Sequence, residues 1–334
     1  MSKLKGFFYY LSIAAIFFLI GWFGNNAYRL PEKPDPAPQI KPTPLLKYSI
    51  ENLSKAEFKS SEIVVGNIIK DTASYSSYEF TMKFSPDFSG NLKKTSGMIN
   101  IPKGSGPFPV IVMYRGYVNQ ETYKVGEGTS PSASFFAQNG FITVAPDFLG
   151  YGDSDPEAAN IFESRFQTYV TAVSVLKSVG SVKEWDGTNI FIWGHSNGGQ
   201  IALTALEITG VSYPTVLWAP VTKPFPASIL YYIDEASDSG RLIIGKLAEF
   251  NETYDAGMFS LTRHFDKIKA PIQLNQGTAD TAVPYWWSDS FVETLEEGGI
   301  DITYIKYPGA NHNFLPLWNQ AVNSSLLFFE SYLR

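Results

Sequence analysis

The chain has 334 residues, of which 44% are hydrophobic and 17% charged, a balance typical of a globular protein with a sizeable core and not of a disordered or fibrous chain. A net charge of −6 without runs of like charge gives no indication of a nucleic-acid partner. The absence of cysteine excludes disulfides and thiolate catalysis, and any imidazole chemistry must use one of only three histidines, His195, His264 and His312.

An apolar segment near the N-terminus, Phe7–Phe23, predicts a membrane anchor within residues 1–28. At about 1.5 Å per residue its helix would be roughly 25 Å long, near the lower limit for crossing a bilayer. Lys3 and Lys5 precede it, and the residues after Phe23 form a poor cleavage signal, so we expect an uncleaved anchor. A cleaved signal peptide and a buried helix are the alternatives. The flanking charges do not decide the orientation, and we favour an extracytoplasmic catalytic domain.

The next segment, residues 29–48, is rich in proline. Repeated proline excludes a helix and predicts an extended, semi-rigid linker; a disordered tail is the alternative. Both interpretations place a domain boundary near residue 48 and leave residues 49–334 for the folded domain.

Residues 49–334 alternate between strand-like and helix-like segments. The expected strands are Ile63–Ile69, Tyr78–Phe84, Gly97–Ile101, Pro109–Tyr114, Phe141–Ala145, Asn189–Trp193, Thr215–Trp218, Ile272–Asn275 and Ile302–Tyr307. The expected helices are Ser132–Gln138, Ile161–Val179, Gln200–Ile208, Trp286–Glu297 and Leu317–Leu333. This alternation predicts an α/β fold with a mostly parallel central sheet covered on both faces. It breaks at about 221–265, where Ile229–Phe250 predicts a helical insertion over the carboxyl edge of the sheet.

The motif Gly194-His195-Ser196-Asn197-Gly198 lies between an expected strand and an expected helix. A serine on such a turn has a strained backbone, so neighbours without side chains must flank it. The start of the helix also presents amide donors to developing negative charge. The motif therefore predicts Ser196 as a nucleophile, with a purely structural turn serine as the alternative.

A nucleophilic serine needs a base, and the base needs an orienting acid. Asp280 and His312 each follow the end of a later expected strand, which gives the order serine, acid, histidine. His195 is expected to point away from the serine, and His264 to lie on the surface or in the insertion. Rival acids without the same combination of order and loop are Asp147, Asp153, Asp155 and Asp301. No metal or cofactor is expected, because metal, phosphate-loop and dinucleotide motifs are all missing.

From about Pro107 to Arg334 these motifs resemble the α/β-hydrolase superfamily, and more narrowly the catalytic domain of the prolyl oligopeptidase family and the dienelactone-hydrolase-like esterases. The resemblance rests on GHSNGG around Ser196, QGTADTAVP around Asp280 and GANHNF around His312. It implies that these three residues form a catalytic triad that makes an acyl-enzyme. It also implies that the oxyanion hole consists of the backbone N–H groups of Asn197 and Tyr117.

The chain departs from the family pattern in three ways. Arg115 stands before the oxyanion turn where a histidine or glycine is often found, and Gln276 replaces the histidine that usually opens the acid loop. The segment between linker and core is also too short for the propeller of the peptidases. An ester is therefore as plausible a substrate as a peptide.

The sequence thus predicts a membrane-anchored serine hydrolase that acts on a small-molecule ester or a short peptide. A carboxylesterase without peptidase activity and a catalytically inactive binding scaffold are the alternatives. Four aromatic residues near the acid and histidine loops are candidate pocket lining, with ordinary helix packing as the alternative: Tyr285, Trp286, Trp287 and Trp318. No oligomeric state is predicted.

Overall fold

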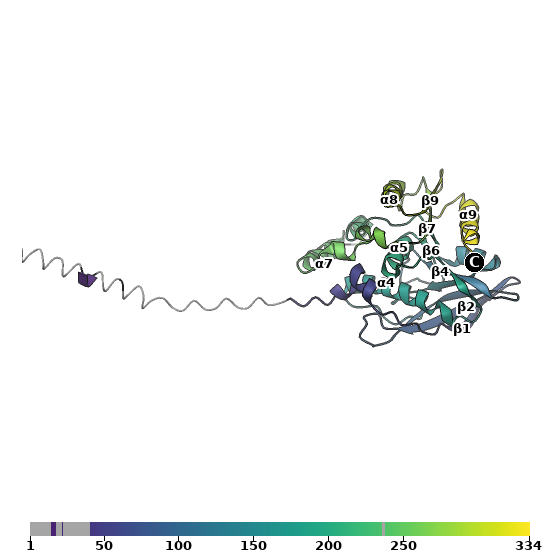
Figure 1. Ribbon diagram of the computed structural model, residues 1–334, viewed down its shortest axis with the longest axis horizontal. Helices are drawn as coiled ribbons and strands as arrows, with labels where there is room; N and C mark the ends of the chain where they lie inside the picture. Colours follow the sequence, from purple (N-terminus) through teal and green to yellow (C-terminus); the bar gives the residue numbers. More distant parts are fainter. Residues whose placement is uncertain (1–14, 18–21, 23–40, 236–237) are drawn as a thin grey trace, which may run out of the picture. The chain divides into compact units, whose positions relative to one another are not determined.

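The computed structural model describes residues 15–17, 22, 41–235 and 238–334 (Figure 1). The predicted anchor, Phe7–Phe23, lies outside the described residues except for residues 15–17 and 22, as do residues 29–40 of the predicted linker. In the part of the chain that is described, no helix is both long enough and apolar enough to cross a bilayer. The chain divides into two compact units, Met1–Pro42 and Thr43–Arg334, and the second unit carries all the features below.

The second unit begins with the short helices η1 (Leu46–Tyr48) and α2 (Ile50–Lys55). The Ser49 side chain caps α2 by accepting a hydrogen bond from the Asn52 N–H. Tyr48 is buried, and its hydroxyl donates to Glu163 at 2.9 Å. The boundary predicted near residue 48 therefore falls inside a packed segment.

A single nine-stranded sheet forms the centre of this unit, in the order β1-β2-β3-β5-β4-β6-β7-β8-β9. The strands are β1 (Val64–Asp71), β2 (Tyr75–Phe84), β3 (Lys93–Pro102), β4 (Phe108–Tyr114), β5 (Ile142–Pro146), β6 (Trp185–His195), β7 (Thr215–Trp218), β8 (Ile272–Gly277) and β9 (Ile302–Tyr307). The first three strands and β5 pair antiparallel, and the pairs from β5 and β4 through to β9 are parallel. Each expected strand overlaps one of these nine, and the predicted mostly parallel sheet is confirmed because five of the eight strand pairs are parallel.

Helices cover both faces of the sheet (Figure 1). The longer ones are α3 (Ser130–Gln138), α4 (Ile161–Ser178), α5 (Asn197–Thr209), α8 (Tyr285–Glu297) and α9 (Trp318–Ser331). Apolar residues of α4, α5 and α8 pack in one core cluster, and those of α3 and α9 pack in a second cluster. The sheet lies between the two clusters, as expected for a parallel sheet whose strands are apolar on both sides.

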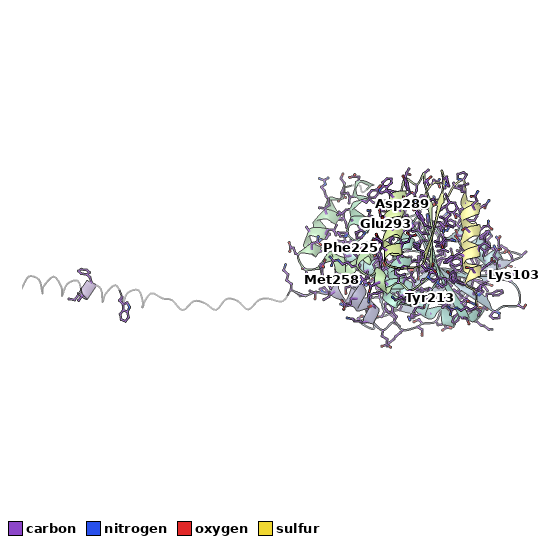
Figure 2. All side chains as sticks on the ribbon, turned by 45° about the horizontal axis from the view of Figure 1, so that its top comes forward. Lys103, Tyr213, Phe225, Met258, Asp289 and Glu293 are labelled. Atoms are coloured by element: carbon purple, nitrogen blue, oxygen red, sulfur yellow. The ribbon has the colours of Figure 1, made fainter. Side chains whose placement is uncertain are left out.

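The insertion predicted at about 221–265 is a series of short helices, not one long helix. They are α6 (Ala227–Leu230), η3 (Ile233–Glu235), α7 (Arg241–Asn251), η4 (Ala256–Phe259) and η5 (Leu261–Arg263), followed by η6 (Phe265–Lys267). Gly240 breaks the expected helix, since its φ of 72° is left-handed and a Cβ there would lie 2.6 Å from Ile233 Cβ. Phe225 (Figure 2) secures the insertion by packing edge-to-face against Phe162 and Phe166 of α4.

Candidate active site

Ser196 occupies the sharp turn between β6 and α5. Its φ of 57° and ψ of −122° are rare for a residue with a side chain. The Ser196 N–H donates to the Trp218 carbonyl at 2.9 Å, and the Ser196 carbonyl accepts from the Val221 N–H at 3.0 Å. These bonds hold the strained backbone in place, as expected for a nucleophile elbow.

The glycines of the motif are required by close backbone approach. A Cβ on Gly198 would lie 1.9 Å from the Tyr114 carbonyl oxygen, and one on Gly194 would lie 2.5 Å from the Gly198 carbonyl oxygen. Real side chains do not occupy such distances, so the spacing of glycine around Ser196 follows directly from the packing of α5 onto β4 and β6.

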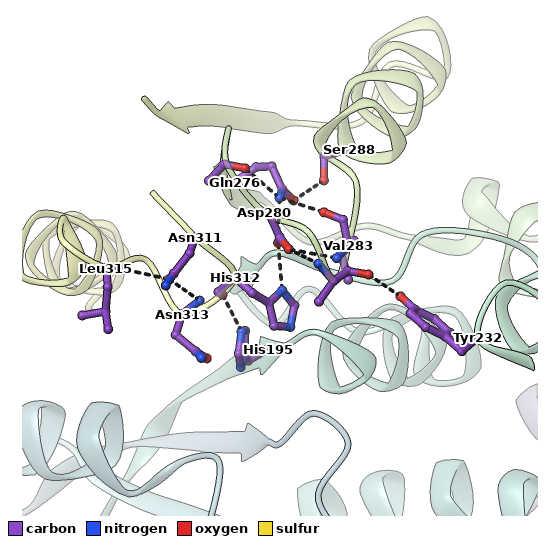
Figure 3. A network of polar contacts seen from close by, with 12 residues as sticks. His195, Tyr232, Gln276, Asp280, Val283, Ser288, Asn311, His312, Asn313 and Leu315 are labelled. Atoms are coloured by element: carbon purple, nitrogen blue, oxygen red, sulfur yellow. Dashed lines mark hydrogen bonds and ion pairs between the residues drawn. The ribbon is translucent and has the colours of Figure 1, made fainter. Parts of the chain in front are cut away.

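Asp280 and His312 meet at the carboxyl ends of β8 and β9 (Figure 3). His312 Nδ1 donates to Asp280 Oδ2 at 2.8 Å, and the Asp280 side chain is fully buried. The second carboxylate oxygen accepts the backbone N–H groups of Ala282 and Val283, both at 2.9 Å. The carboxylate is therefore fixed on both sides, and it orients the imidazole.

Gln276 is a further member of this network that sequence reasoning noted only as a departure from the family pattern. It is fully buried, and its Nε2 donates to Asp280 Oδ2 at 3.1 Å and to the Val283 carbonyl at 3.3 Å. Its Oε1 accepts from the Ser288 hydroxyl at 2.8 Å (Figure 3). Gln276 thus links the acid to helix α8, a role that only the folded arrangement reveals.

His195, which is expected to point away from the serine, contacts the histidine loop. Its Nε2 donates to the His312 carbonyl at 3.0 Å, and the two imidazole rings lie 4.7 Å apart. Burial lowers the pKa of His195 to about 4, so the ring is neutral near pH 7. The residue before Ser196 therefore supports the histidine loop. His264 lies instead in the insertion, as expected, between η5 and η6.

Asn197 and Tyr117 belong to two segments that lie next to the serine. Asn197 is the first residue of α5, where backbone N–H groups have no partner within the helix. Tyr117 follows Gly116, and a Cβ on Gly116 would lie 2.9 Å from Ser196 Cβ. The backbone of both segments therefore borders Ser196.

Arg115 holds the turn that contains Gly116. Its guanidinium donates to the Gly116 carbonyl at 3.0 Å and to the Asp147 carbonyl at 2.8 Å, and it lies 4.0 Å from the ring centre of Tyr151. The Asp147 side chain accepts hydroxyl hydrogen bonds from Ser96 and Tyr123, both at 2.6 Å. Asp147, one of the alternatives to Asp280 in the sequence analysis, thus helps to hold this loop in place.

A cavity of about 1250 Å³ joins these parts, and its wall includes Ser196, Asn197, Tyr117 and His312. Among the described residues no hydrogen bond connects the Ser196 hydroxyl to the His312 ring. Catalytic hydrogen bonds are often long in free enzymes and tighten when substrate binds. Here Ser196 and His312 line the same cavity.

Of the four aromatic residues predicted to line a pocket, the cavity wall includes only Trp318. The prediction is corrected for the other three. Trp287 is buried against Val221 and Val283, whereas Tyr285 and Trp286 are exposed on α8. Tyr285 and Trp286 lie on the outward side of α8, whose inner side packs on the sheet. Trp193 and Trp218, at the ends of β6 and β7, line the cavity instead.

Comparisons with known proteins show what the chain is similar to. The model of the prolyl oligopeptidase family matches residues 128–333. Acetyl esterase Axe7A of Xylanibacter ruminicola is 25% identical over 212 residues, which cover 56% of this chain and 46% of that protein. Dipeptidyl peptidase family member 6 of Caenorhabditis elegans is 24% identical over 198 residues, which cover 55% of this chain and 26% of that protein. The chain thus spans less than half the length of these curated relatives.

Among solved structures, acetyl xylan esterase 1 from Thermoanaerobacterium sp. JW/SL YS485 is similar with a TM-score of 0.62 and 16% sequence identity. The alignment covers 87% of this chain and 95% of that chain. At this level of identity the similarity shows a shared α/β-hydrolase fold.

Proposed function

The chain belongs to the prolyl oligopeptidase family, and on this premise we propose that it is a serine hydrolase that cleaves an ester or peptide bond through an acyl-enzyme. The observation that carries the proposal is the 2.8 Å contact between His312 Nδ1 and Asp280 Oδ2, because His312 lines the same cavity as Ser196. The Asp280 carboxylate can only accept a hydrogen bond, so His312 Nδ1 carries the proton of this contact. His312 Nε2 is therefore the nitrogen that is available as a base.

The reaction follows from these positions. Ser196 Oγ attacks the substrate carbonyl carbon while His312 Nε2 takes the hydroxyl proton. The imidazolium, stabilised by Asp280, then gives this proton to the leaving group, and the C–O or C–N bond breaks. In the second half of the reaction, water takes the place of the serine hydroxyl. His312 removes one proton from the water, and the resulting hydroxide adds to the acyl carbon. The carboxylic acid then leaves as the imidazolium returns the proton to Ser196. Both tetrahedral intermediates carry an oxyanion that the N–H groups of Asn197 and Tyr117 stabilise.

We place an ester before a peptide as substrate. Side chains such as Trp218, Ile229 and Ile243 make much of the cavity wall, and they offer few partners for the N–H and C=O groups of a peptide. The chain's own insertion supplies part of the cavity wall. Rates on aryl esters and on proline-containing peptide anilides separate an esterase from a peptidase.

The test of the chemistry is covalent labelling. A fluorophosphonate should label the wild-type chain and Ser290→Ala, a control at an exposed serine of α8, but not Ser196→Ala. Equal labelling of Ser196→Ala would contradict Ser196 as nucleophile. A folded wild-type chain inert to the probe and to every ester would favour the inactive scaffold.

We also propose, from the sequence, that residues 7–23 anchor the chain in a bilayer and that residues 49–334 form an extracytoplasmic catalytic domain. The full chain should remain with membranes after alkaline extraction, and deletion of residues 1–28 should release it. Release of the full chain by alkali would contradict the anchor, and resistance of the domain to protease added outside the cell would contradict the orientation.

A further inference from the structure

Arg165, on helix α4, is a cation that the proposed chemistry does not use. It is partly buried, and one terminal nitrogen of its guanidinium donates to Gln200 Oε1. Gln200 is itself buried and donates through Nε2 to the Lys223 carbonyl at 3.1 Å. The amide oxygen of Gln200 therefore must face Arg165, and the contact is a hydrogen bond to a neutral group.

No carboxylate among the described residues pairs with Arg165 within the 4.0 Å that defines an ion pair. Its Nε–H is buried and has no hydrogen-bond partner. A partly buried charge is costly unless a counter-charge or hydrogen bonds compensate it. Arg165 thus has donor capacity and positive charge that the folded chain leaves available.

Arg165 also stands where two cavities meet. It lines the large cavity that contains Ser196, and it lines a smaller neighbouring cavity of about 200 Å³. The two cavities also share Gly116, Tyr117 and Asn197, the backbone that borders the nucleophile. A substrate whose carbonyl lies at this backbone can therefore extend one end toward Arg165.

The smaller cavity has a positive balance. Arg115 also lines it, with its terminal nitrogens bound to carbonyl oxygens. The one carboxylate in its described wall is Glu157, which accepts from the Ser164 hydroxyl. The Asp147 carboxylate, held by Ser96 and Tyr123, interacts electrostatically with Arg115. Two guanidinium groups and one carboxylate therefore belong to the described wall of this cavity.

We propose that Arg165 determines specificity by binding a carboxylate on the substrate, so that the preferred substrates are esters that carry an anionic group besides the scissile bond. This rests on the proposed serine-hydrolase function. A guanidinium presents its donors in a planar fork that matches a carboxylate, and the small cavity offers room for such a group beside the oxyanion backbone. The anion can belong to the acyl part or to the leaving group.

The test uses two pairs of substrates that differ only in charge. For the leaving group, 4-acetoxybenzoate is compared with its methyl ester; for the acyl part, the 4-nitrophenyl half-ester of adipic acid is compared with 4-nitrophenyl methyl adipate. The measured quantity is the ratio of kcat/KM for the anionic ester to that for the neutral ester. For at least one pair we expect Arg165→Gln to lower this ratio by about tenfold or more, since a charge-assisted hydrogen bond is lost.

Two further variants make the result specific. Lys177→Gln removes a positive charge from an exposed position on the same helix and should keep the wild-type ratio. Arg165→Lys keeps the charge without the planar fork and should give an intermediate ratio. Competitive inhibition by adipate or 4-hydroxybenzoate should weaken in Arg165→Gln in parallel with the ratio.

The inference is overturned if Arg165→Gln lowers both rates of each pair equally, because Arg165 would then only brace Gln200. The inference is also overturned if Lys177→Gln changes the ratio as much as Arg165→Gln does, because the effect would then come from net charge alone. In either case the esters are still hydrolysed and the serine-hydrolase proposal stands. Failure of that proposal looks different: no ester is hydrolysed and Ser196 is not labelled.

Discussion

Replacing Gln276 by methionine tests whether the buried amide positions the acid. Methionine is unbranched and adaptable, so it can fill a similar volume without a hydrogen-bond donor. The change removes the donor to Asp280 Oδ2 at 3.1 Å and the acceptor of the Ser288 hydroxyl at 2.8 Å. Because both Gln276 and Ser288 are fully buried, water cannot replace the lost partners.

The magnitude follows from these contacts. A hydrogen bond to a charged group contributes about 1.5–3 kcal/mol and a neutral one about 1 kcal/mol, so the free energy of unfolding should fall by about 2–4 kcal/mol. Asp280 Oδ2 would keep only His312, and a less well oriented imidazole should lower kcat/KM by about tenfold, equivalent to roughly 1.4 kcal/mol.

The assays are urea unfolding and kcat/KM on a neutral aryl ester. Ser288→Ala is the matched control, because it removes only the bond to Oε1 and leaves the amide facing Asp280. It should cost about 1 kcal/mol of stability and leave kcat/KM within about twofold of wild type. The reasoning is refuted if Gln276→Met keeps wild-type kcat/KM, or if Ser288→Ala lowers it as much.

Three further variants test other features. His195 has a pKa of about 4 in the folded chain against 6.5 for a free imidazole, so the unfolded chain binds more protons between these values; unfolding free energy should fall by about 2 kcal/mol from pH 7.5 to pH 5. His195→Asn should reduce that fall, and an unchanged pH dependence would contradict the assignment. Burial raises the pKa of the Glu207 carboxyl well above its usual 4.5, so its contribution to stability is lost as pH rises above 4.5. Glu207→Met should therefore be more stable than wild type at pH 7, with an advantage that shrinks toward pH 4 in urea unfolding. Gly198→Ala would place a Cβ 1.9 Å from the Tyr114 carbonyl oxygen, and a soluble variant with wild-type melting temperature and activity would disprove that this approach requires glycine.

The strands of the central sheet could be predicted because a strand that is buried on both faces is a continuous apolar run, as in Pro109–Tyr114. Such runs are easy to recognise in the sequence. Asp280 and His312 could be placed at one sheet edge because each follows a strand, and parallel strands end at the same edge. Their 2.8 Å contact is consistent with that placement.

Other features depend on side-chain packing that no local pattern records. Whether a tryptophan near the acid or histidine loop lines the cavity depends on how its helix packs: Trp287 of α8 is buried against Val221 and Val283, whereas Trp318 of α9 lines the cavity. The inward position of His195 depends on the path of the His312 backbone. Gln276 and Ser288 are ordinary polar residues in the sequence, and only the fold makes them partners.

The contribution of the insertion to the cavity has a practical consequence. Ser228, Ile229, Tyr232, Ile233 and Ile243 all line the large cavity, and all come from one continuous stretch of chain. Ser196, Asp280 and His312 lie outside this stretch. If the proposed function holds, exchanging this one stretch for that of another hydrolase should alter which acyl and leaving groups are accepted, while the proposed triad is left unchanged.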